Sequence, residues 1–147
     1  MKLFLVFILF ILSLTSLKIS NIKPEFILIF VIYIGLKLKE SKALFLGVFL
    51  GLIEDGLSYF PLGLYALTKG ISGFLASKIG KNFAVDNFLS FAIIVSILAF
   101  FENLFFLGIF SLFPYEKEGI LKILLLQPVI TFLASSIFFY FMNKYEI

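Results

Sequence analysis

The sequence contains no cysteine, no histidine and no tryptophan, and its twelve basic residues are all lysine. Without cysteine the chain can form no disulfide, and without cysteine and histidine it lacks the thiolate and imidazole ligands of metal sites. Catalysis by a Cys–His pair or a Ser–His–Asp triad is excluded for the same reason. The net charge of +3 is spread along 147 residues, which gives no basic patch for nucleic acid. The composition therefore predicts no metal, no cofactor and no nucleic-acid partner.

Apolar side chains are abundant instead and make up 62% of the residues. A soluble globular domain is roughly 45–50% apolar, and a soluble core of this length could not bury the excess. The lipid bilayer must therefore be the solvent of most of the chain. We predict an all-α integral membrane protein, in which residues 1–147 form one polytopic domain, a single bundle of six transmembrane helices.

Short polar loops divide the chain into six apolar segments. We expect helices over about residues 3–17, 24–38, 43–57, 61–79, 88–113 and 120–142. The first two are shorter than the ~20 residues that a span normally needs, and lysines at their ends can reach the headgroups to make up the length. The first segment also fits a secretory signal peptide. Because no small-residue cleavage site follows it, we expect it to be retained as a helix.

The distribution of lysine predicts the orientation of this bundle. Seven lysines lie on the side that holds both termini and the second and fourth loops: Lys2, Lys37, Lys39, Lys42, Lys78, Lys81 and Lys144. Four lie on the other side: Lys18, Lys23, Lys117 and Lys122. Because lysine-rich loops stay in the cytoplasm, both termini are predicted to be cytoplasmic.

The stretch 47–67 carries two adjacent carboxylates, Glu54 and Asp55, within an otherwise apolar run. A charge at the centre of a bilayer costs ~3 kcal/mol on insertion scales, so its presence there indicates a role. Gly47 and Gly51 lie four residues apart on one helix face, where they let another backbone approach closely. We expect that backbone to belong to the same chain, and a contact between two copies is the alternative.

Part of this stretch resembles the MreD family, the small integral membrane subunit of the bacterial rod-shape machinery. The pattern is a glycine-spaced apolar helix that ends in Gly-Leu, followed by Asp, a short loop and Pro-Leu-Gly. The matching residues here are Gly51, Leu52, Asp55, Ser58, Pro61, Leu62 and Gly63. Because the fixed φ of proline suits a first helical turn, Pro61 predicts the start of the fourth helix.

The resemblance implies a non-catalytic scaffold in the bacterial inner membrane that helps to set cell shape. Its implied partners in the cell-wall elongation complex are MreC first, then the MreB filament, the glycosyltransferase RodA and its paired class B transpeptidase. Asp55, Ser58, Pro61, Leu62 and Gly63 are the residues expected at the outer corner that meets MreC. For Pro61 and Gly63, turn geometry alone is an equally good explanation.

Polar side chains in four predicted helices lie at a similar depth. A rise of ~1.5 Å per residue places Asp55, Lys69, Glu102 and Gln127 about 9–12 Å below the outer edge of a ~30 Å hydrocarbon slab. We expect these four residues to converge inside the bundle as a buried polar layer, with Lys69 paired to Asp55 or Glu102. The layer has two possible roles. It holds the helices together, or it has a function, in which it lines an outward cavity or positions a partner's helix.

Two other functions are open on the residues alone. Six short helices around an outward polar pocket also resemble the substrate-binding subunits of vitamin importers, so a small-molecule importer subunit is the alternative function. An intramembrane enzyme would need a Ser–Lys pair, formed by Lys69 with Ser58 or Ser72. Because nothing in the sequence resembles an oxyanion hole, we expect no enzymatic activity.

Overall fold

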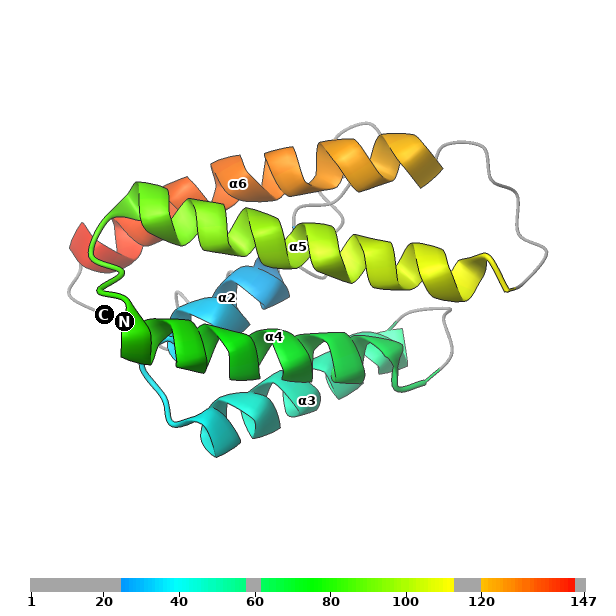
Figure 1. Cartoon of the computed structure of the whole chain (residues 1–147), viewed down its shortest axis with the longest axis horizontal. Coiled ribbons are helices and arrows are strands. Elements are labelled where there is room, and N and C mark those ends of the chain that lie inside the picture. Colours follow the sequence, from blue (N-terminus) through cyan, green and yellow to red (C-terminus); the bar gives the residue numbers. More distant parts are fainter. Residues whose placement is uncertain (1–24, 58–61, 113–119, 145–147) are drawn as a thin grey trace. The chain divides into compact units, whose positions relative to one another are not determined.

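A computed structural model describes residues 25–57, 62–112 and 120–144, and its helices carry the labels of Figure 1. These residues form α2 (Phe26–Gly35), α3 (Glu40–Leu57), α4 (Leu64–Asn82), α5 (Phe88–Phe110) and α6 (Ile120–Lys144). The prediction of an all-helical chain is confirmed for the described residues, which contain no strand. The structure shows five helices where six were predicted, and the expected helix over 3–17 lies outside the described residues.

Several helix ends differ from the prediction. α3 begins at Glu40 and not at Ala43, because the Ala43 N–H already donates to the Lys39 carbonyl at 2.9 Å and closes a helical turn. α4 begins at Leu64, so the prediction that it starts at Pro61 is wrong. Its N-cap is Gly63, whose φ of 103° lies in the left-handed region that glycine adopts without a steric penalty.

The chain divides into two compact units. The first, Ile27–Asn87, contains nearly all of α2 together with α3 and α4, and we call it the α2–α4 unit. The second consists of Met1–Phe26 and Phe88–Ile147, and we call it the α5–α6 unit. The prediction that residues 1–147 form one domain stays a prediction.

In the α2–α4 unit, α3 and α4 run side by side in opposite directions, and glycine allows them to touch (Figure 1). A Cβ atom at Gly47 would lie 2.2 Å from the carbonyl oxygen of Lys69. One at Gly51 would lie 2.4 Å from the carbonyl oxygen of Tyr65. No Cβ atom fits at either distance, so the expectation that Gly47 and Gly51 pack on a helix of the same chain is confirmed.

α2 is the most deeply buried helix of this unit. The side chains of Leu28, Ile29, Val31 and Ile32 are all 0% exposed. After the helix ends, the Leu38 carbonyl accepts a hydrogen bond of 2.7 Å from the hydroxyl of Ser77, which lies on α4. This bond joins the segment between α2 and α3 to the last third of α4.

The α5–α6 unit contains the two described helices that are long and apolar enough to cross a membrane, over Phe88–Ile109 and Leu124–Lys144. Their contact includes the stacked rings of Phe91 and Phe139, with centroids 5.1 Å apart. Ser96 Oγ of α5 donates to the Pro128 carbonyl of α6 at 3.4 Å. Large apolar side chains such as Phe101 point outward and are 61% exposed, as expected of a surface that faces lipid.

Candidate functional site

Asp55, in the last turn of α3, caps the first turn of α4. Its carboxylate accepts hydrogen bonds from the backbone N–H groups of Gly63 and Tyr65, each at 2.9 Å, and of Ala66 at 3.1 Å. The first N–H groups of a helix have no partner within that helix and carry partial positive charge, so a carboxylate satisfies them and interacts well with the helix dipole. Gly63, the N-cap residue, has no side chain that could accept these hydrogen bonds. Asp55, which belongs to the preceding helix, accepts them instead.

This cap explains why a carboxylate is tolerated at a position where it is 1% exposed. The end of α3 alone would disfavour an anion, because the C-terminus of a helix carries partial negative charge. The beginning of α4 supplies the opposite charge within hydrogen-bond distance. Asp55 therefore fixes the corner between the two helices.

The residues of the MreD-like motif divide into buried and exposed groups. Gly51 and Asp55 are buried and hold α3 against α4. Leu52 is 50% exposed and Leu62, next to the left-handed Gly63, is 81% exposed. Ser58 and Pro61 lie outside the described residues. The corner therefore combines a fixed backbone with outward leucine side chains.

Lys69 of α4 is fully buried and forms an ion pair with Glu54 of α3. The Lys69 Nζ lies 3.5 Å from Oε2 of Glu54, whose side chain is 25% exposed. The same ammonium lies 5.4 Å from the ring centroid of Tyr65, within the range of a cation–π contact. The structure gives Glu54 as one partner of this lysine, and the pairing with Asp55 or Glu102 that the sequence suggested stays a prediction.

The other two members of the predicted polar layer belong to the α5–α6 unit. Glu102 is 3% exposed on α5, and its neighbour Asn103 is 8% exposed. The Gln127 amide of α6 donates to a carboxylate oxygen of Glu25, a residue that the sequence analysis did not select. The sequence did contain a sign that Glu25 could matter, because this acid directly precedes an apolar segment. The convergence of Asp55, Lys69, Glu102 and Gln127 into one layer stays a prediction.

Nothing in the described ranges suggests a metal centre, because they contain no group of three or more carboxylates that could hold an ion. The polar side chains placed together in the α2–α4 unit instead serve helix capping and charge pairing. Its exposed apolar side chains include the leucines of the corner.

Comparison with known protein families gives a match over nearly the whole chain. The family described as rod shape-determining protein MreD matches residues 1–146, which covers both units. No curated protein and no solved structure matches the chain.

Proposed function

The chain belongs to the MreD family, so it is a membrane protein with a role in rod-shape determination, and we propose from this premise that it is a non-catalytic scaffold. In this proposal MreC is its direct partner within the cell-wall elongation complex. MreB, RodA and a class B transpeptidase are associated through that complex. The family match favours this function over the importer subunit.

The observation that supports a docking role is the corner fixed by Asp55. Three hydrogen bonds from backbone N–H groups to the Asp55 carboxylate hold the start of α4 to the end of α3. Leu62, 81% exposed, and Leu57, 60% exposed, project from the two sides of that corner. The hydrogen-bonded ends of α3 and α4 lose little conformational entropy on binding, which favours affinity for a partner. We propose that these leucines contact MreC, together with Ser58 and Pro61.

The experiment that tests this contact compares two equally exposed leucines. Leu62 and Leu112 are each 81% exposed, and in the proposed orientation both lie at the outer side of the membrane. We expect Leu62→Glu to lower the amount of MreC that co-purifies from native membranes about tenfold, which corresponds to ~1.4 kcal/mol. Leu112→Glu should leave it unchanged. Equal recovery of MreC with both variants would exclude the corner, and no recovery with the unchanged chain would exclude MreC as the direct partner.

We also propose that both termini lie in the cytoplasm, which places the Asp55 corner outside and the start of α3 inside. The absence of cysteine from the chain makes this directly measurable. A membrane-impermeant maleimide added to whole cells should label Leu62→Cys. Ser41→Cys, at the opposite end of α3, should react only after the cells are permeabilised. The reverse pattern would invert the orientation.

A further inference from the structure

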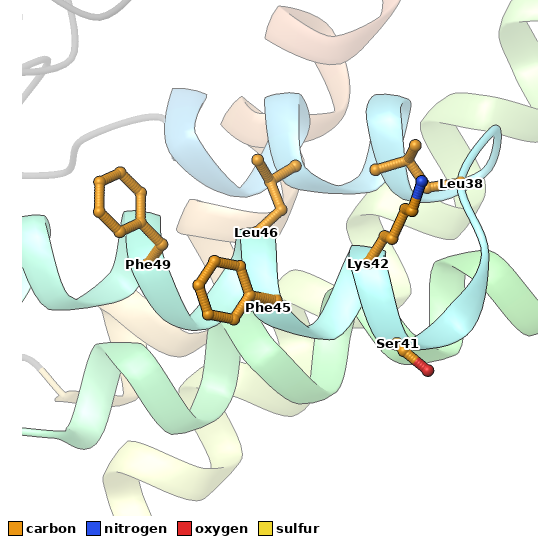
Figure 2. A pocket seen from close by; sticks show the side chains of 6 residues that line it. All are labelled: Leu38, Ser41, Lys42, Phe45, Leu46 and Phe49. Atoms are coloured by element: carbon orange, nitrogen blue, oxygen red, sulfur yellow. The ribbon is translucent and has the colours of Figure 1, made fainter.

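An apolar groove of about 320 Å³ lies on the surface of the α2–α4 unit, along the first half of α3. Figure 2 shows the side chains that line it, with Lys42 and Leu38 together at one end and Phe49 at the other. The lining residues are Leu38, Ser41, Lys42, Phe45, Leu46 and Phe49. Apart from Ser41 and the ammonium group of Lys42, this wall is hydrocarbon.

The groove is open to the surroundings of the protein. Phe45 is 71% exposed and Phe49 is 54% exposed. In the proposed multi-pass topology, the medium outside these rings is the bilayer, where exposed aromatic rings are stable. From Lys42 to Phe49 the helix rises about 10 Å, and one leaflet of the hydrocarbon core is about 15 Å thick. The groove is thus long enough for much of one acyl chain.

The end of the groove that holds Lys42 is strongly basic. Five lysines and two acids lie at this end of the α2–α4 unit: Lys37, Lys39, Lys42, Lys78, Lys81, Glu40 and Asp86. Lys81 Nζ lies 2.9 Å from Oε1 of Glu40, so the Glu40 carboxylate is already paired. Within the described part of the chain, Lys39 and Lys42 have no carboxylate partner. Their charge is available to an anion at the membrane surface.

We propose that this groove is a binding site for an anionic phospholipid, with one acyl chain against Phe45, Leu46 and Phe49 and the phosphate beside the Lys42 ammonium. An apolar wall that ends in an unpaired cation matches the two parts of such a lipid. A lipid with a zwitterionic headgroup brings its own cation and gains less from Lys42. In the proposed orientation the lipid belongs to the cytoplasmic leaflet, and the chemistry of the site does not depend on MreC.

The chain has no tryptophan, so a single Phe45→Trp substitution gives a fluorophore at the groove without background. The purified full-length variant is reconstituted in phosphatidylcholine vesicles that contain brominated phosphatidylglycerol or, at the same fraction, brominated phosphatidylcholine. Bromine quenches the fluorescence of tryptophan that it contacts.

We expect an apparent affinity about five times higher for the anionic lipid, the factor given by ~1 kcal/mol for one lysine at an anionic surface. Lys42→Gln in the same background should remove this preference, whereas Lys122→Gln on α6 should not.

The matched reporter is Phe101→Trp on α5, where the replaced ring is 61% exposed. We expect both brominated lipids to quench it equally. Equal quenching of the Phe45→Trp reporter by the two lipids would overturn the proposal. Absence of quenching at Phe45→Trp, with normal quenching at Phe101→Trp, would also overturn it and show that protein covers the groove. The vesicles contain no MreC and have two identical leaflets, so a failure of the proposed partner or orientation leaves this result unchanged.

Discussion

The carboxylate of Asp55 accepts a hydrogen bond of 3.1 Å from the backbone N–H of Ala66, eleven residues further along the chain. The acid that ends one helix therefore caps the next, although four intervening residues, 58–61, lie outside the described residues. The cap makes the geometry of the α3–α4 corner depend on a single buried carboxylate.

Loss of the cap should destabilise the protein. Asp55→Ala leaves the N–H groups of Gly63, Tyr65 and Ala66 without their acceptor, which we expect to cost about 2 kcal/mol. Asp55→Asn should cost less, because its amide oxygen still accepts one hydrogen bond but lacks the negative charge. The measurement is thermal unfolding of the purified protein in detergent. Asp86→Ala, which removes an exposed acid between α4 and α5, is the control, and equal melting temperatures for Asp55→Ala and Asp86→Ala would contradict the role of the cap.

Even one additional methyl group at Gly51 should destabilise the contact between α3 and α4. A Cβ atom there would meet the Ala66 Cα at 2.4 Å, so the two backbones would have to separate. Overpacking of this kind costs roughly 1–3 kcal/mol, which outweighs the 0.5–1 kcal/mol that Gly→Ala otherwise gains in a helix. We expect Gly51→Ala to lower the amount of folded protein in membranes.

Gly108 provides the matched control for that substitution. It also lies within a helix, α5, but a Cβ atom there would meet nothing within 4 Å. Gly108→Ala should therefore leave the level of folded protein unchanged or raise it slightly. If both alanine variants accumulate to the same level, the close approach of α3 to α4 is not needed for stability.

The ion pair between Lys69 and Glu54 should show energetic coupling. Removal of one partner leaves the other charge with less compensation in a region of low dielectric, and the fully buried Lys69 is the more sensitive member. We expect Lys69→Met and Glu54→Gln each to lower stability and the double variant to lose less than the sum, with a coupling of about 0.5–3 kcal/mol. Lys69→Met combined with Asp86→Asn should be additive. Additivity of Lys69→Met with Glu54→Gln as well would show that the pair contributes nothing specific.

The sequence predicted the existence of the five described helices, because long apolar runs between lysine-rich loops determine them directly, whereas the helix over 3–17 stays a prediction. It also predicted the contact of Gly47 and Gly51 with a helix of the same chain, since two small residues four apart mark one face. It did not predict the role of Asp55, because a cap supplied across a loop leaves no signal at the N-cap position itself. Pro61 gave a misleading start for the fourth helix, because proline is typical of a first helical turn and Gly63, the actual N-cap, has no capping side chain.

The partner of Lys69 was harder to predict for a different reason. Counting residues gives the depth of a side chain but not its direction around the helix. Glu54 and Asp55 are adjacent in depth but point about 100° apart, since a helix has ~3.6 residues per turn. One of them therefore pairs with Lys69 and the other caps α4, a division that only the packing of α3 on α4 decides.

The charged end of the α2–α4 unit should make stability depend on pH in the acidic range. The hydrogen bond from Lys81, together with the positive charges of Lys81 and Lys78, lowers the pKa of Glu40 below its ordinary value of 4.5. The folded state therefore binds this proton less readily than the unfolded chain. The stabilisation by the pair is complete above the ordinary pKa and is lost as the pH falls through the lower pKa of the folded state.

We expect Glu40→Gln to lower the melting temperature at pH 7 and to have no effect at a pH below the pKa of folded Glu40, where the unchanged carboxyl is also neutral. Both side chains are partly exposed, 54% for Lys81 and 34% for Glu40, so the difference at pH 7 should be small and should shrink in 1 M salt, where the Debye length is about 3 Å. Lys81→Gln should remove most of the same pH dependence, because it removes the hydrogen bond and the nearest charge, whereas the weaker attraction of Lys78 remains. A Glu40→Gln effect that persists at low pH would instead show that Glu40 acts through packing of its side chain, since its charge would already be absent.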